Sequence, residues 1–168
     1  NLAEAGTYYQ QALKLDRQLY QETKTVQARR SLSIGLESLG SLSLDEKNLT
    51  QAKRYYLQCL ELRRQLCQET ETADSRQILS AAYSNLGDIS REEGNFTEAK
   101  AYYEKSLELC GSLWEETRTR KAGWSLSSAY VNLCDVSTAE GDLAQAKDYC
   151  LKGLELDRQL YDESQTID

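Results

Sequence analysis

The sequence predicts an all-α protein of about seven helices in antiparallel pairs, and two observations lead to this fold class. The first is composition: proline is absent from the 168 residues, Leu, Glu, Gln, Lys, Arg and Ala dominate, and β-branched Val and Ile are scarce. The second is an internal repeat of 47 residues that recurs without insertions. Each repeat holds two amphipathic stretches that cannot bury their apolar faces alone, so the repeats should stack.

The chain begins with the segment NLAEAGTYYQQALKLDRQLYQET at Asn1, and equivalent segments begin at Asn48, Asn95 and Asp142. Leu and Ala recur at matching positions of the four copies and form an apolar stripe along each predicted helix. The matching positions are Leu13, Leu60, Leu107 and Leu154, and Ala5, Ala52, Ala99 and Ala146. We expect residues 1–26 to form a lone helix of this second type, without the partner helix that the other copies have.

Three partner segments alternate with these copies and begin at Arg29, Arg76 and Gly123. Their apolar residues follow spacings of three and four, which places them on one face of a helix. The sequence therefore predicts that the lone helix is followed by three helix pairs, all within a single array over residues 1–168. The expected pairs occupy residues 27–72, 73–119 and 120–168.

Turn and capping residues mark the expected helix ends. Gly94 can end one helix, Asn95 can cap the next, and Glu98 stands three residues later, as in a capping box. At the other end of a pair, Thr70 and Thr72 suit a break followed by a new N-cap. Because these connections are short, consecutive helices should run antiparallel.

Small residues and tyrosines recur at the repeat period and predict how paired helices pack. Small side chains should let the helices of a pair approach closely. They stand at Gly40, Gly87 and Cys134, and we expect Ala52, Ala99 and Ala146 opposite them. Each Tyr-Tyr pair should belong to the helix–helix core, with its second tyrosine the more buried. The pairs are Tyr8–Tyr9, Tyr55–Tyr56 and Tyr102–Tyr103.

These residues resemble the tetratricopeptide repeat family. The resemblance is carried by an aromatic, Leu-Gly, Gly, aromatic, Ala and aromatic at Tyr83, Leu86, Gly87, Gly94, Phe96, Ala99 and Tyr103. The family's terminal proline is absent, with Gly111 in its place in one unit, and the period is 47 residues instead of about 34. Longer-helix repeats similar in style occur in kinesin light chains. The resemblance implies a right-handed superhelical solenoid of antiparallel helix pairs.

The resemblance also implies that the first helix of each pair lines a concave groove whose exposed residues select a ligand. The candidate groove residues are Glu37, Ser41, Ser84, Asn85, Asp88, Arg91, Val131, Asn132 and Asp135. Glu37, Ser84 and Val131 stand where family members that clamp a C-terminal carboxylate have lysine, so that ligand is not expected. Asp88 and Asp135 favour a polar or basic peptide instead. The alternative, which the sequence leaves open, is that this face is merely solvated.

The five cysteines predict free thiols. They occupy five different places in the 47-residue unit, form no C-x-x-C pair, and lack any histidine that could complete a metal site. They are Cys59, Cys67, Cys110, Cys134 and Cys150. Scattered unpaired thiols are typical of a reducing compartment, so we expect a cytoplasmic protein.

Charge and motifs exclude several functions. The net charge of −7 argues against nucleic-acid binding, and no apolar run is long enough to span a membrane. Histidine, a Gly-rich phosphate loop and a nucleophile elbow are all absent, so we expect neither enzymatic activity nor a cofactor.

The leading functional hypothesis is a scaffold that binds a peptide or partner protein through the groove. One alternative is a regulatory or sensor domain of a larger signalling protein, since a chain that starts at Asn1 without Met suggests a fragment. Another is a module that self-associates through its open first helix.

Overall fold

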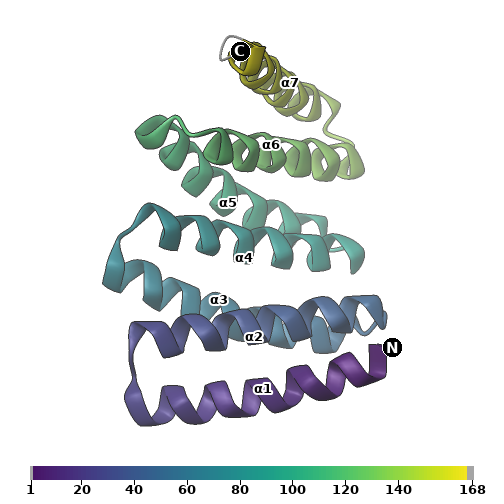
Figure 1. The fold of residues 1–168 in the computed structure, drawn as a ribbon. Helices are drawn as coiled ribbons and strands as arrows, with labels where there is room; N and C mark the ends of the chain where they lie inside the picture. Colours follow the sequence, from purple (N-terminus) through teal and green to yellow (C-terminus); the bar gives the residue numbers. More distant parts are fainter. Residues whose placement is uncertain (1, 166–168) are drawn as a thin grey trace. The chain divides into compact units, whose positions relative to one another are not determined.

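The expected helix-forming segments all fold into helices (Figure 1). The computed structural model describes residues 2–165, and within that range it contains seven α-helices and no β-strand. The helices are α1 Leu2–Thr23, α2 Val26–Asp45, α3 Leu49–Thr70, α4 Ala73–Glu92, α5 Phe96–Thr117, α6 Arg120–Glu140 and α7 Leu143–Gln165. The all-α prediction is confirmed.

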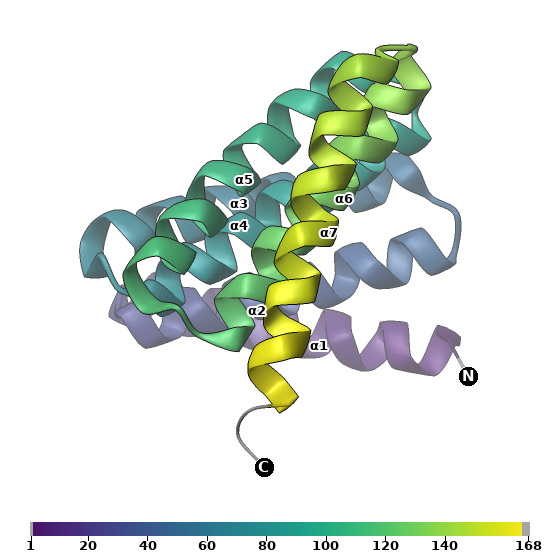
Figure 2. The same cartoon turned by 90° about the horizontal axis from the view of Figure 1, so that it is seen from above.

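The chain divides into two compact units, Asn1–Ser75 and Arg76–Asp168. In the first unit α2 packs against both α1 and α3, and in the second α6 packs against both α5 and α7. Figure 2 shows α7, in yellow, beside α6 at the C-terminal end of the second unit. The expected repeat boundaries at 27–72, 73–119 and 120–168 stay a prediction.

The connection inside each helix pair ends in the capping residue that the sequence predicts. Backbone N–H groups donate to the side chains of Asn48, Asn95 and Asp142 at 3.1, 3.3 and 3.0 Å. The residue before each cap has a left-handed backbone, with φ of +75° at Gly94 and +83° at Gly141. Glycine adopts this conformation without steric cost, so the helix can stop and reverse within three residues.

The connection between pairs relies on threonine caps. The N–H of Ser75 donates to Thr72 Oγ1 at 3.1 Å, and Thr25 and Thr119 cap α2 and α6 in the same way. The predicted break at Thr70 is confirmed, because α3 ends there. α1, α3 and α5 are each 22 residues long, so the residues beyond the usual repeat length extend the helices.

A glycine–tyrosine contact holds the helices of a pair close together. A Cβ added to Gly40 would lie 2.9 Å from the Tyr56 ring, and one added to Gly87 would lie 2.6 Å from Tyr103 Cδ1. The close approach is confirmed, but the expectation that Ala52 and Ala99 stand opposite is wrong. Tyrosine rings fill these positions, because a glycine has no Cβ that would occupy the same space.

Two of the three tyrosine pairs belong to the helix–helix core as the sequence predicts, but the expectation is wrong for the first pair, Tyr8–Tyr9, which is exposed. Tyr103 is fully buried and Tyr102 only half-buried, while Tyr56 and Tyr55 are 3% and 9% exposed. Tyr9, in the open first helix, is 43% exposed against 70% for Tyr8. The second tyrosine of each pair is thus the more buried one.

The expectation that all five cysteines are free thiols is wrong. Cys134 of α6 and Cys150 of α7 form a disulfide with a Cα–Cα distance of 5.4 Å, whereas Cys59, Cys67 and Cys110 are free. Cys134 stands at the glycine position of the close contact and Cys150 at its tyrosine position, so the two side chains face each other. The inference of a reducing compartment from scattered thiols therefore loses its basis.

Candidate functional site

The candidate groove residues of the first unit lie together in a pocket. Glu37 and Ser41 of α2, with Asp45 one turn further, line a cavity of about 450 Å³. Ala5 and Tyr9 of α1 form its other wall. The face that the sequence singled out on α2 therefore carries a hollow with two carboxylates and an aromatic ring.

Glu37 is also anchored to the core of its own helix pair. Arg63 of α3 donates to both of its carboxylate oxygens, Nη1 to Oε1 at 2.8 Å and Nη2 to Oε2 at 2.6 Å. Burial alone would lower the pKa of the Arg63 guanidinium, whose side chain is 3% exposed, but the hydrogen bonds that it donates to Glu37 raise the pKa overall. Glu37 therefore neutralises a buried cation as well as lining the pocket.

A tyrosine hydroxyl positions the next groove residue in each of two helix pairs. Tyr103 donates to Asp88 Oδ1 at 2.7 Å, and Tyr56 shares a hydrogen bond of 2.9 Å with Ser41. Burial and the Asp88 carboxylate both raise the pKa of the Tyr103 hydroxyl, so it stays protonated and can donate. The same rings that close the helix contact thus fix the rotamers of Asp88 and Ser41.

Asp88, Arg91 and Asp135 form a charged cluster on the second unit. Arg91 Nη2 lies 3.8 Å from Asp88 Oδ1, and both side chains are about two-fifths exposed. Burial lowers the pKa of Arg91, but Tyr103, Asp88 and Asp135 raise it overall. Asp88 thus pairs with Arg91, and Asp135 adds a second carboxylate near the same cation.

The remaining groove candidates divide between buried and exposed positions. Ser84 shares a hydrogen bond of 2.9 Å with Ser106, so it faces α5, and Asn85 is half-buried. Val131 and Asn132 line a cavity of about 410 Å³ together with Trp124 and Asp157. Trp124 is 58% exposed, and it was not among the residues that the sequence indicated. The sequence could have indicated Trp124, because it is an aromatic residue at a position where the other repeats have Arg30 and Gln77.

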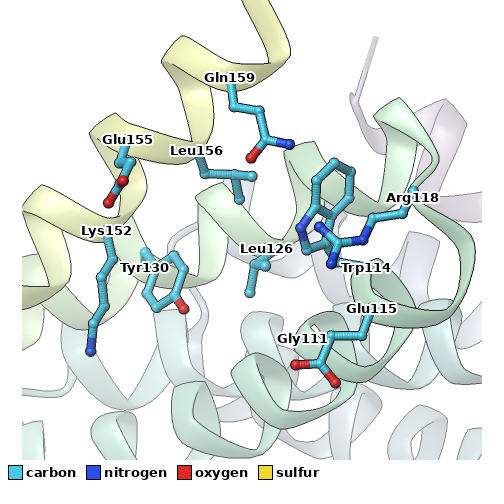
Figure 3. A pocket seen from close by; sticks show the side chains of 10 residues that line it. All are labelled: Gly111, Trp114, Glu115, Arg118, Leu126, Tyr130, Lys152, Glu155, Leu156 and Gln159. Carbon is cyan, nitrogen blue, oxygen red and sulfur yellow. The ribbon is translucent and has the colours of Figure 1, made fainter. Parts of the chain in front are cut away.

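A further cavity of about 370 Å³ opens between α5, α6 and α7, away from any predicted residue (Figure 3). The Arg118 guanidinium lies over the Trp114 ring, 5.1 Å from the ring centroid. Leu126 and Leu156 lie between this stacked pair and Tyr130. A Cβ added to Gly111 would meet nothing within 4 Å. Arg17 occupies the position equivalent to Gly111 in the first unit, and its guanidinium donates a hydrogen bond to Gln58 at 2.9 Å. Because Gly111 has no side chain, the corresponding space beside α5 stays open as this cavity.

No helix in the part of the chain that the structure describes is long and apolar enough to cross a membrane. Within the same residues, His, Cys, Asp and Glu side chains do not gather in any group of three that could hold a metal ion.

Antiparallel helix pairs with a repeated glycine–aromatic contact define a helical-repeat protein. The tetratricopeptide repeat model matches residues 36–66, 80–112 and 127–160, which together make up more than half of the chain. The chain belongs to the tetratricopeptide repeat family. Such repeats are in general protein-interaction scaffolds, and their fold is typically non-catalytic.

Solved structures of other helical proteins have a similar fold. BtubC (BKLC) from P. vanneervenii matches with 20% sequence identity and a TM-score of 0.75, over 95% of this chain and 58% of that one. The de novo designed helical repeat protein DHR81 matches with 17% identity and a TM-score of 0.53, over 99% of this chain and 81% of that one. No curated protein matches. The predicted solenoid fold class is confirmed, and this chain spans 58% of the length of the BtubC chain.

Proposed function

We propose that the chain binds polar or basic segments of a partner protein, through the exposed face of α2 in the first unit and through those of α4 and α6 in the second. The observation that carries this proposal is the charge of those faces. Glu37 and Asp45 line the pocket of the first unit, and Asp88 and Asp135 flank Arg91 in the second. The carboxylates of Glu37 and Asp88 are held by intramolecular hydrogen bonds and lose little side-chain entropy on binding, so they are suited to recognising Lys, Arg or backbone N–H groups.

At positions 37, 84 and 131, neither unit presents a cation that would favour a C-terminal carboxylate. Glu37 is acidic, Ser84 bonds to Ser106, and Val131 is apolar, so none of these three positions supplies a cation to an incoming carboxylate. The exposed Trp124 and Val131 beside Asp157 would instead accept an apolar side chain that is followed or preceded by a basic one.

Charge removal on α4 and α6 tests the proposed function. We expect Asp88→Asn with Asp135→Asn to weaken binding of eight-residue Lys-containing peptides about tenfold at low salt, since each exposed charge pair contributes about 0.5–1 kcal/mol. Asparagine at 88 can still accept the hydrogen bond from Tyr103, so folding should be preserved. Fluorescence anisotropy with labelled peptides measures the affinities.

A matched control removes the same number of negative charges from a different surface of the second unit. Glu104→Gln with Glu108→Gln removes two exposed carboxylates from α5 and should alter the affinity less than twofold. Equal affinity for Lys-containing and Glu-containing peptides, or no difference between the two double variants, would contradict the proposed site.

Self-association is a second candidate function, and the exposed apolar stripe of α1 favours it. Tyr8, Leu15 and Leu19 recur at spacings of seven and four on α1 and are 70%, 66% and 46% exposed. If this face pairs with a second copy, the mass measured by light scattering should rise from monomer to dimer between about micromolar and millimolar concentrations. Leu15→Glu should keep the chain monomeric, while Ile34→Glu, at an exposed site on α2, should not. A monomeric wild type throughout the series rejects this candidate.

A further inference from the structure

The α6–α7 pair carries a double replacement at the contact that closes the two preceding pairs. In each pair the two facing residues are 16 positions apart in the sequence. The facing residues are Gly40 with Tyr56, Gly87 with Tyr103, and Cys134 with Cys150. A glycine and a tyrosine are thus exchanged together for two cysteines.

Packing explains why both positions change, but it does not explain why both become cysteine. A side chain at position 134 would clash with a tyrosine at 150, as the 2.6 Å approach of a Cβ at Gly87 to Tyr103 shows. Any two small side chains would relieve that clash. Two cysteines at a Cα–Cα distance of 5.4 Å have in addition the spacing that a disulfide requires, and their Sγ atoms are bonded.

The disulfide can be reached from solvent, whereas the free thiols of the core cannot. Cys134 is 7% exposed, but Cys150 is exposed on the surface of α7. Cys59 and Cys110 are buried, and burial raises the pKa of the Cys59 thiol to about 12 and that of Cys110 in the same direction. Exposed disulfides are the ones that exchange with small thiols, and thiols of raised pKa are poor nucleophiles.

We propose that Cys134 and Cys150 form a reversible thiol–disulfide exchange site that locks the α6–α7 pair when oxidised and releases it when reduced. In reduction, a thiolate of a small dithiol attacks Cys150 Sγ, the Cys134–Cys150 bond breaks, and the Cys134 thiolate takes up a proton. The second thiol of the dithiol loses its proton and displaces Cys150, which is protonated in turn. Two electrons and two protons pass to the protein, and the dithiol becomes a disulfide. Oxidation by a small disulfide runs in reverse.

The exchange site lies next to the proposed binding face, and the coupling between them rests on the proposed function. Asp135 directly follows Cys134, and Val131 lies about one turn earlier on α6. In the preceding pair Tyr103 holds Asp88 by a hydrogen bond, whereas Cys150 has no hydroxyl to hold Asp135. The covalent bond therefore replaces the tyrosine as the link between the two helices, and its loss should loosen the face that carries Asp135.

Thermal unfolding with and without a small dithiol tests the lock. We expect reduction to lower the Tm of the wild type by roughly 5–10 °C, as for a disulfide that closes a loop of this length in a chain of this size. The double variant Cys134→Ser with Cys150→Ser should have the same Tm as the reduced wild type, and the dithiol should not change that Tm. Cys134→Gly with Cys150→Tyr rebuilds the contact of the other pairs and should remain folded and insensitive to the dithiol. If reduction leaves the Tm of the wild type unchanged, the proposal that the disulfide locks the α6–α7 pair is wrong.

Alkylation of the folded protein after equilibration in mixtures of reduced and oxidised glutathione tests reversibility. Mass spectrometry should show Cys134 and Cys150 becoming reactive together, while Cys59 and Cys110 stay unlabelled. Labelling of Cys134 or Cys150 at every glutathione ratio, or at none, overturns the exchange site. Lys-containing peptides should bind the oxidised form at least threefold more tightly. If labelling and Tm respond but peptide affinity does not, the exchange site stands and its coupling to the proposed function is rejected.

Discussion

Gly87→Ala should lower the free energy of unfolding by about 2 kcal/mol, although alanine is the better helix former by about 1 kcal/mol. The added Cβ would lie 2.6 Å from Tyr103 Cδ1. The Tyr103 ring is fully buried, and its hydroxyl donates a hydrogen bond to Asp88. The ring therefore cannot move aside without losing that hydrogen bond. Because overpacking outweighs the gain in helix propensity, we expect the Tm to fall by roughly 4–8 °C.

Gly111→Ala is the matched control, since it makes the same change inside a neighbouring helix. A Cβ at Gly111 meets nothing within 4 Å, so only the helix propensity changes. We expect the free energy of unfolding to rise by about 0.5–1 kcal/mol. Urea denaturation of the two variants should therefore shift the midpoint in opposite directions. A stabilised Gly87→Ala variant would show that the Gly87–Tyr103 contact is not tight.

Glu37→Ser should lower the free energy of unfolding by about 3 kcal/mol, because it removes the carboxylate that neutralises a buried guanidinium. The Arg63 side chain is 3% exposed and donates two hydrogen bonds to Glu37. The predicted loss is several times larger than that for an exposed charge. Glu22→Ser, at an exposed position of α1, serves as the control and should cost less than about 1 kcal/mol.

A second replacement distinguishes loss of the charge pair from a local packing defect. Adding Arg63→Cys to Glu37→Ser recreates the combination that α4 and α5 carry at the equivalent positions, Ser84 and Cys110. Since both charges are then absent, we expect most of the stability to return. Chemical denaturation of the single and double variants measures the difference. Equal stability of the two would assign the loss to packing around residue 37.

The outward orientation of the candidate residues could be inferred from the sequence, but their charged partners could not. The 3.6-residue period places Ser41, Asp88 and Asp135 away from the leucine stripe, and these residues do lie on the outward side of α2, α4 and α6. Arg63 was missed because its repeat equivalents are Asp16, Cys110 and Asp157, which show no common role. A charge pair that occurs in one repeat leaves no periodic signal.

The disulfide is a second contact that the sequence did not reveal. The evidence was present in the sequence as a glycine–tyrosine pair that recurs 16 residues apart and becomes cysteine–cysteine once. This pattern indicates a disulfide only once the two positions are known to face each other across the helix pair. With alanine placed opposite the glycine, the pattern gives no reason to pair Cys134 with Cys150.

The sequence by itself determined the helices, their boundaries and the 47-residue repeat, because helix propensity, capping and apolar periodicity act within a few residues of one another. Which side chains meet was decided only by the tertiary structure. Gly87 meets Tyr103, Arg63 meets Glu37, and Cys134 meets Cys150. Each of these contacts depends on the distance and rotation between two packed helices, and neither quantity is encoded in a single helix.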